Sequence, residues 1–198
     1  AQNRPTKVTD PLGHETKYAY DKNGNLETLT DGNGHVTKYT YDADNERTKV
    51  EAANETTTET AYDSMGSVKS KTDGNGKTTK YEHNALEELT ETIDPLERKT
   101  TREYDKAGNL EKLKGPEART TTFTYDKANR LTKESYSEEA THKVQYTYDK
   151  DSHVTKMVDG TGTSETTYDV LDRPTEVKNG NSEVVKYEYN LANLPTKI

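Results

Sequence analysis

The chain has 198 residues and a formal net charge of −8, and 32% of its residues are charged, whereas Leu, Ile, Val and Phe together number only 26. This acidic balance argues against nucleic-acid binding, which depends on clustered Lys and Arg side chains that neutralise phosphates. No apolar run approaches the roughly 20 residues of a membrane span, and the absence of cysteine excludes disulfides and cysteine-ligated metal sites.

So few apolar residues would by themselves predict a disordered chain, but the tyrosines follow a regular pattern. Tyr-Asp, or a degenerate copy of it, returns in steps of 21, 21, 21, 21, 21, 23, 20 and 21 residues. Thirteen of the 14 tyrosines occupy two positions of this period, and only Tyr136 does not. A fixed period of this length is typical of repeat architectures, and tyrosine rings supply part of the missing apolar area.

The first element of each unit is a strand that ends at the Tyr-Asp tyrosine, which we number position 0. Positions −4, −2 and 0 are mostly Thr, an aromatic residue and Tyr, and a spacing of two places them on one face of a β-strand. The intervening residues, such as Lys17 and Lys38, are polar. The expected strands are 16–20, 37–41, 58–62, 79–83, 100–104, 121–125, 144–148, 164–168 and 185–189.

The aromatic residues at positions −2 and 0 are the structural site residues of the repeat. They are Tyr18, Tyr20, Tyr39, Tyr41, Tyr62, Tyr81, Tyr104, Phe123, Tyr125, Tyr146, Tyr148, Tyr168, Tyr187 and Tyr189. We expect them to form ladders in the core of the array, in preference to an exposed platform on which sugars stack. Tyr136, in the 23-residue unit, is the best candidate for an exposed aromatic side chain.

A turn and a second strand follow in each unit. Position +4 is mostly Gly or Asn, the residues that accept a positive φ. Positions +6 and +9 carry apolar residues, such as Leu26 and Leu29, but they differ in parity. Both cannot be buried on one face of a regular strand. We therefore expect either a β-bulge between them or a turn that includes position +6, and the sequence leaves both options open.

A second turn closes the unit, and segments such as Asp10-Pro11-Leu12-Gly13 indicate a type I β-turn. The prediction is an all-β fold in which antiparallel hairpin repeats of about 21 residues give about eighteen short strands. Because a long meander does not stay flat, we expect it to wind into a spiral shell, barrel or tube that covers the tyrosine face.

The repeat closely resembles the YD-repeat, or RHS-repeat, family, whose units look like the segments Thr37–Asp42 and Tyr125–Lys133. The family includes bacterial RHS polymorphic toxins, wall-associated proteins, insecticidal toxin-complex C components and teneurins. The resemblance implies a β-ribbon that spirals into a hollow shell, which encloses a C-terminal effector domain in toxin members. Other members act in cell-surface contact with proposed carbohydrate binding.

The core segment with a self-cleaving Asp-Pro motif, which toxin members carry, is not visible here. Asp10-Pro11 and Asp94-Pro95 are interpreted as turns instead. We expect residues 1–198 to be a single continuous array of about nine units without capping units at either end. Such a chain is either part of a longer array or a subunit that assembles with identical copies.

No catalytic, cofactor or metal site is expected. Asp31-Gly32-Asn33-Gly34 and the matching segment 73–76 have too few carboxylates for a calcium loop, which favours plain turns. The five histidines do not cluster in sequence; the first two are expected to face solvent, and the third replaces an aromatic residue of the repeat. They are His14, His35, His83, His142 and His153.

The preferred function is therefore a structural YD-repeat segment of a large secreted or cell-surface bacterial protein, not an enzyme, whose β-shell encapsulates or displays another domain. The alternatives are a self-assembling extracellular fibre or tube subunit and an adhesion module that binds glycans or a surface. The expected partners are neighbouring repeats of the same or identical chains, with an enclosed effector domain or surface glycans as further candidates.

Overall fold

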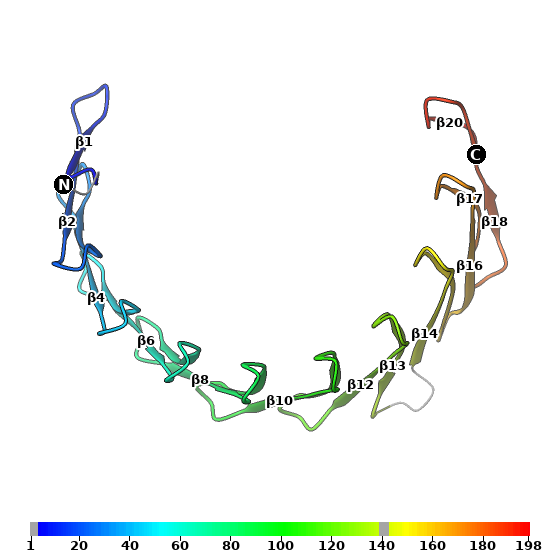
Figure 1. Cartoon of the computed structure of the whole chain (residues 1–198), viewed down its shortest axis with the longest axis horizontal. Coiled ribbons are helices and arrows are strands. Elements are labelled where there is room, and N and C mark those ends of the chain that lie inside the picture. Colours follow the sequence, from blue (N-terminus) through cyan, green and yellow to red (C-terminus); the bar gives the residue numbers. More distant parts are fainter. Residues whose placement is uncertain (1–3, 139–142) are drawn as a thin grey trace. The chain divides into compact units, whose positions relative to one another are not determined.

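The computed structural model describes residues 4–138 and 143–198. The regular secondary structure of these residues consists of β-strands (Figure 1). None of them belongs to a helix long and apolar enough to cross a membrane. The backbone forms two compact units, Ala1–Lys99 and Thr100–Ile198, which are considered separately.

The first unit contains nine strands, in which short second strands alternate with six-residue strands that end at position 0. They are β1 (Lys7–Thr9), β2 (Glu15–Tyr20), β3 (Leu26–Thr30), β4 (Val36–Tyr41), β5 (Arg47–Glu51), β6 (Thr57–Tyr62), β7 (Val68–Thr72), β8 (Thr78–His83) and β9 (Leu89–Ile93). Each strand pairs antiparallel with the next strand along the chain.

The second unit begins within β10 and repeats the same alternation. Its strands are β10 (Lys99–Tyr104), β11 (Leu110–Lys114), β12 (Thr120–Tyr125), β13 (Leu131–Tyr136), β14 (Lys143–Tyr148), β15 (Val154–Asp159), β16 (Gly162–Tyr168), β17 (Pro174–Lys178), β18 (Val184–Lys186), β19 (Glu188–Tyr189) and β20 (Pro195–Lys197). Strands β10 to β18 pair antiparallel in succession, and β19 pairs with β20.

A β-bulge in each hairpin resolves the parity of positions +6 and +9. Tyr20 lies opposite Leu26 and Tyr18 lies opposite Leu29, and the register shifts by one residue between these two pairs. The bulge therefore returns both apolar positions to the tyrosine face, as a bulge inserts one extra residue into one strand. The same shift occurs at the tyrosines of β4, β12, β14 and β16, among others.

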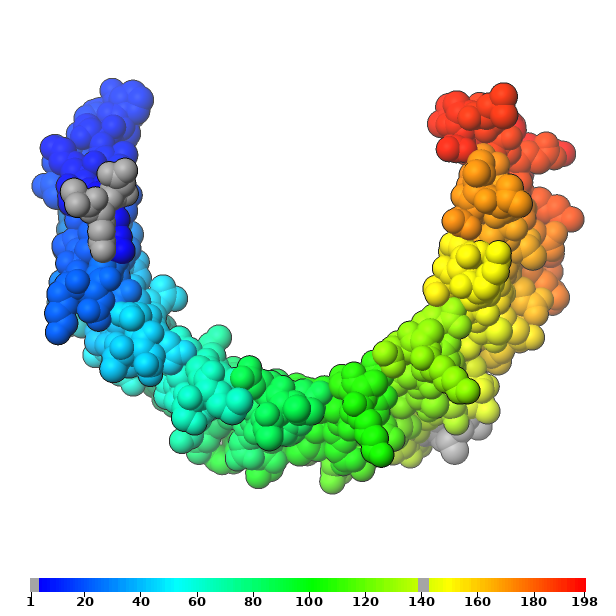
Figure 2. All heavy atoms as spheres, in the orientation of Figure 1, coloured from blue at the N-terminus to red at the C-terminus, as the bar shows by residue number. Residues whose placement is uncertain are grey.

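Neither unit has a buried core. No described residue is buried, and the side chains on the tyrosine face are half-buried. The ribbon draws each unit as one layer of strands (Figure 1), and the space-filling view shows the same band of chain with all its heavy atoms (Figure 2). The expected covering of the tyrosine face is therefore not found within either unit, where the strands contact their neighbours in the sheet.

Two of the 21-residue repeats depart from the regular period, and both do so near their second turn. The 20-residue step has a two-residue loop, because Asp159 lies directly opposite Gly162. The 23-residue step extends β13 to Tyr136, and residues 139–142 lie outside the described residues. The antiparallel pairing of the flanking strands is kept in both cases.

The all-β fold of antiparallel hairpin repeats is confirmed. The described residues form twenty strands where about eighteen were expected. The difference arises because β1 precedes the first Tyr-Asp unit and because the last tyrosine strand is divided into β18 and β19 at Tyr187.

Candidate functional site

The position-0 tyrosines connect each repeat to the repeat before it. Seven of them donate a hydrogen bond from the hydroxyl group to the carbonyl of the preceding unit's position +6, which borders the β-bulge. The pairs are Tyr20–Pro5 at 3.1 Å, Tyr41–Leu26 at 3.1 Å, Tyr62–Arg47 at 3.2 Å, Tyr125–Leu110 at 2.9 Å, Tyr148–Leu131 at 2.7 Å, Tyr168–Val154 at 3.2 Å and Tyr189–Pro174 at 2.8 Å. Since a bulge interrupts the ladder of backbone hydrogen bonds, the hydroxyl supplies a donor at that point.

The residue after each position-0 residue begins a turn, which we call the Tyr-Asp turn. In the turn at Asp126, the Asn129 amide donates to the Asp126 carbonyl at 3.0 Å and the Asp126 amide donates to the Arg130 carbonyl at 2.9 Å. Oδ1 of Asp126 accepts the amides of Ala128 at 2.8 Å and Arg130 at 3.0 Å. Asn129, at position +4, has φ 59°. This is a type I turn followed by a left-handed residue.

The positive φ expected at position +4 is confirmed in all nine units. Gly or Asn occupies six of these positions, and Glu87, Ser152 and Asp172 adopt φ values of 62°, 74° and 61°. The second turns follow the same plan, since Asp31 Oδ1 accepts the amides of Asn33 and His35 at 2.9 Å. Where Asp begins a turn, its side chain therefore stabilises that turn, since it satisfies amides that the strand ladder leaves unpaired.

Position +5, which the sequence analysis did not single out, joins consecutive Tyr-Asp turns. Arg130 donates from Nε to Asp126 Oδ2 at 2.8 Å, and from Nη1 to the Asp149 carbonyl at 2.9 Å and Ser152 Oγ at 3.2 Å. Its guanidinium carbon lies 4.7 Å from the ring centroid of Tyr148. We call this arrangement, in which a +5 side chain contacts its own turn and the next, a clasp.

Other clasps use the same positions. Arg173 donates to Asp169 Oδ2 at 2.7 Å and to Asn193 Oδ1 at 2.8 Å, and it lies 4.5 Å from the ring centroid of Tyr189. Two asparagines at +5 make the corresponding hydrogen bonds to the Asp of their own turn and to the +4 residue of the next unit. They are Asn25, which contacts Asp21 and Asn45, and Asn109, which contacts Asp105 and Asn129.

In two places a long side chain at +5 lies against a glycine at the next unit's +4 position. Where +5 is Arg4 or Glu46, the next +4 residue is glycine. A Cβ on Gly24 would collide with the guanidinium of Arg4, and a Cβ on Gly66 would lie 3.0 Å from Glu46 Oε1. Pairing positions 20 residues apart would have revealed this relation in the sequence.

The clasps and turns stabilise the charged form of the turn aspartates. The side-chain hydrogen bond from Arg173 lowers the pKa of Asp169, although partial burial opposes this shift. The backbone amide and guanidinium of Arg130 likewise lower the pKa of Asp126. The pKa of Asp105 is lowered mainly by the side-chain amide of Asn109. Hydrogen bonds to a carboxylate favour its ionised form.

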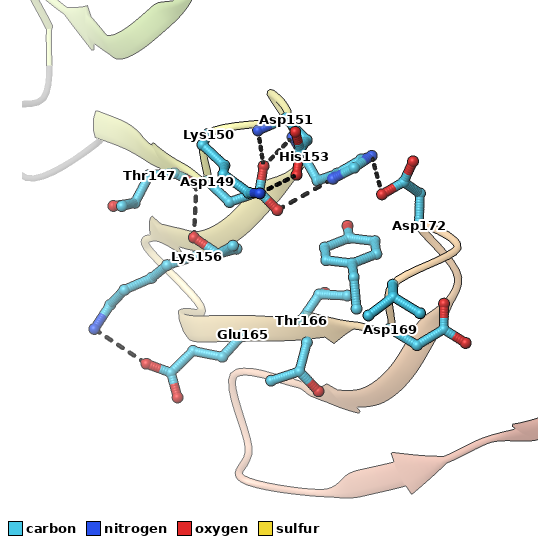
Figure 3. Close-up of a pocket in the computed structure, with 14 residues that line it drawn as sticks. Thr147, Asp149, Lys150, Asp151, His153, Lys156, Glu165, Thr166, Asp169 and Asp172 are labelled. Carbon is cyan, nitrogen blue, oxygen red and sulfur yellow. Dashed lines mark hydrogen bonds and ion pairs between the residues drawn. The ribbon is translucent and has the colours of Figure 1, made fainter.

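An open groove of about 960 Å³ lies between two consecutive Tyr-Asp turns of the second unit (Figure 3). Its walls include Asp149 and His153 of one turn and Asp172 of the next. His153 Nδ1 lies 3.1 Å from Asp149 Oδ2, and the imidazole is tilted 30° against the ring of Tyr168 with the centroids 4.8 Å apart. His153 lies five residues after Tyr148, so it occupies position +5 of this repeat.

Metal ions in proteins are held by groups of His, Cys, Asp and Glu side chains. Among residues 4–138 and 143–198, no group of three or more His, Asp or Glu side chains is placed to hold a metal ion. Burial raises the pKa of Asp149, but the backbone and side-chain hydrogen bonds from His153 outweigh it and lower the pKa overall. The side chains that line the groove are mainly polar or charged.

The structural site residues expected from the sequence all lie on half-buried positions of the tyrosine face. Tyr18, Tyr20, Tyr39, Tyr41, Tyr62, Tyr81, Tyr104, Phe123, Tyr125, Tyr146, Tyr148, Tyr168 and Tyr189 lie in strands, and Tyr187 lies between β18 and β19. Tyr136 is 40% exposed, as expected, and its hydroxyl donates to Glu134 Oε1 at 2.6 Å. The contribution of these residues to stability stays a prediction.

The remaining sequence motifs lie in ordinary turns. The amides of Gly13 and Glu97 donate to the carbonyls of Asp10 and Asp94, so both Asp-Pro dipeptides belong to turns. His14 and His35 face solvent, with Nδ1 against the Asp of their own turn at 2.8 and 3.0 Å. His83 replaces a position-0 tyrosine in β8. His142 lies outside the described residues.

Comparison with known proteins identifies the repeats in two regions of the sequence. The RHS Repeat family model matches residues 1–36 and 20–57, and the Teneurin YD-shell model matches residues 121–198. No curated protein matches the chain.

Similar folds occur in solved toxin complexes. The crystal structures of TcdB2-TccC3-Cdc42 and TcdB2-TccC3-TEV each match with a TM-score of 0.60 and 16% identity, over 91% and 98% of this chain. The Photorhabdus luminescens Tc holotoxin pore matches with a TM-score of 0.58 and 15% identity over 94% of this chain. The chain spans only 12–13% of the length of these matched chains.

At this identity the solved structures bear on the fold alone, and they share the antiparallel strand repeats found here. The hydrogen bonds from position 0 to position +6 recur in both units of the structure, and the family models match repeats in both halves of the sequence. These matches support a YD/RHS-repeat protein that forms a structural repeat segment.

Proposed function

We propose that this chain forms part of the β-shell of a large secreted or cell-surface protein. It would be one continuous YD-repeat array without catalytic activity of its own. The shell would encapsulate or display another domain of that protein. In this role the repeats pack against neighbouring repeats, and the enclosed domain is the second partner.

The observation that carries the proposal is the uniformity of the contacts between repeats. Each contact from a position-0 hydroxyl to a position-+6 carbonyl joins one unit to the unit before it, as at Tyr41 and Tyr125. Stability in such arrays is approximately a sum of unit and neighbour terms. A chain stabilised between neighbours in this way suits an extended wall, because no unit needs a separate hydrophobic core.

The half-buried tyrosine face gives further support. No described residue is buried. The aromatic rings of the repeat are half-buried and lie on one face of the sheet. Such a face gains stability when it is turned away from water, as it would be on the inside of a shell. The match to a YD-shell family model agrees with this role.

Limited proteolysis of the protein encoded by the complete reading frame tests encapsulation. A segment outside the array is expected to resist protease in the intact protein, and to become cleavable when Tyr125→Ala and Tyr148→Ala together open the wall. Tyr136→Ala is the matched control, since Tyr136 lies outside the repeat pattern.

Two results would refute the proposal. The outside segment could be cleaved in the intact protein as fast as when it is expressed alone. Alternatively, the reading frame could encode repeats and nothing else, in which case electron microscopy of the purified protein would test the fibre alternative. Glycan-array binding lost on Tyr136→Ala, without protection of any segment, would favour adhesion instead.

A further inference from the structure

The clasp at His153 is incomplete compared with the clasps on either side of it. Arg130 reaches the carbonyl of the next turn at Asp149, at 2.9 Å. The equivalent carbonyl for His153 is that of Asp169, and the shorter imidazole makes no hydrogen bond to it. His153 Nε2 also lies 3.8 Å from Asp172 Oδ1, which is beyond hydrogen-bond distance.

Two carboxylates that line the groove share a single imidazole. Three other acidic side chains of the groove are paired: Glu165 with Lys156 at 3.2 Å, Asp151 with Lys150 at 3.7 Å, and Asp169 with Arg173 at 2.6 Å. Asp149 and Asp172 both face His153, so that two carboxylates meet a single imidazole. The groove therefore carries negative charge that favours a cation.

The neighbouring clasps indicate which cation fits. Arg130 and Arg173 each place a guanidinium between an Asp of one turn and the +4 side chain and +1 carbonyl of the next. At the groove the +4 side chain is Asp172 and the +1 carbonyl is that of Asp169. A planar guanidinium presents several donors in a fixed geometry that suits a carboxylate and a carbonyl together.

We propose that this groove binds a guanidinium group, supplied by an arginine side chain of a partner polypeptide, beside the imidazole of His153. The guanidinium donates to the Asp172 carboxylate and the Asp169 carbonyl, and its charge offsets Asp149 and Asp172. The bound arginine completes the clasp between the turns at 149–152 and 169–172. The site requires only residues of the second unit.

NMR titration of the isotope-labelled chain with L-argininamide tests this site. Saturable shifts are expected at His153, Tyr168 and Asp172. Smaller shifts are expected at Tyr189 and Asn193, where Arg173 already fills the clasp. L-citrullinamide is the matched ligand control, because it has a similar shape and hydrogen-bond donors but a neutral side chain.

Two variants separate the site from general attraction to an acidic surface. His153→Arg places an internal guanidinium in the groove and is expected to abolish the saturable shifts. Asp172→Asn is expected to weaken binding by about fivefold, the upper range for an exposed ion pair. Asp44→Asn, in an exposed turn of the first unit, is the control that keeps full binding.

Several outcomes would overturn the proposal. They are an equal response to L-citrullinamide, unchanged binding by the folded His153→Arg variant, and an equal loss of affinity in Asp44→Asn and Asp172→Asn. The last result would reveal attraction to the net negative charge of the chain instead of a site. Circular dichroism of each variant verifies that it is folded, and Asp172→Asn decides the question if His153→Arg does not fold.

Discussion

Removing the hydroxyl of Tyr148 isolates the contact that joins consecutive repeats. In Tyr148→Phe the ring stays under the guanidinium of Arg130, and only the 2.7 Å hydrogen bond to the Leu131 carbonyl is lost. A neutral hydrogen bond contributes about 0.5–1.5 kcal/mol. For a chain of this size, 1 kcal/mol lowers the melting temperature by about 2–4 °C.

Tyr148→Ala removes the ring as well as the hydroxyl. Deleting a buried aromatic side chain costs about 3–5 kcal/mol, and roughly half of this applies to the half-buried ring of Tyr148. The lost contact with Arg130 adds about 0.5–1 kcal/mol. With the lost hydrogen bond, we expect a decrease of about 3–4 kcal/mol in the free energy of unfolding.

Thermal and urea unfolding followed by far-ultraviolet circular dichroism measures both variants. Tyr136→Phe is the control, because the hydroxyl of Tyr136 donates to the Glu134 side chain of its own strand instead of a carbonyl of the preceding repeat. Its effect is expected to stay within about 0.5 kcal/mol. The assignment of Tyr148 as the link between repeats is refuted if Tyr136→Phe destabilises the chain as much as Tyr148→Phe does.

Three further predictions concern the turns and the clasps. Arg173→Leu should cost about 1–2 kcal/mol and speed amide exchange at Asn193, without any change in the first unit; unchanged exchange would contradict the clasp. Gly162→Ala should destabilise more than Gly34→Ala, because its Cβ would meet a backbone oxygen at 2.7 Å whereas the Cβ at Gly34 meets open space; equal melting temperatures would argue against this. Hydrogen bonds, led by that of His35, lower the pKa of Asp31 in the folded chain below 3.8. The contribution of Asp31 to stability is therefore present above pH 4 and is lost in more acidic solution. Asp31→Asn should reduce this loss of stability in melting experiments at acidic pH, and an unchanged acid profile would count against the prediction.

The turns show why an asparagine is expected to replace an aspartate without loss of the fold. Asn84 begins a Tyr-Asp turn and accepts the amides of Leu86 and Glu88 with Oδ1 at 2.9 and 3.1 Å. The turn therefore needs an acceptor oxygen at this position. When the residue is aspartate, the carboxylate charge also makes the stability of the turn depend on pH.

Local patterns predicted much of the fold because they depend on the backbone of a few consecutive residues. Alternation at positions −4, −2 and 0 indicated the strands, and Gly or Asn at +4 indicated the left-handed residue, which the structure confirms even at Glu87. The odd spacing of Leu26 and Leu29 left two options for the hairpin, a β-bulge or a turn that includes Leu26. The choice of a bulge required the register of β2 against β3.

The clasps and the groove could not be derived from the spacing within one unit. Arg130 contacts residues about 20 positions further along the chain, and this distance is closed only when two hairpins lie side by side. His153 occupies the same position as Arg130, but the consequence of its shorter side chain is visible only beside Asp172. The contacts at position +5 therefore could not be predicted from a single repeat.

The sequence by itself determined the period, the strands and the turn residues, since alternation and backbone preference operate within a few residues. The tertiary structure decided which atoms join one repeat to the next. It placed the tyrosine hydroxyls on the carbonyls beside the bulges and the +5 side chains across consecutive turns. These contacts depend on the register and spacing of neighbouring hairpins, which are properties of the folded sheet and not of any one segment.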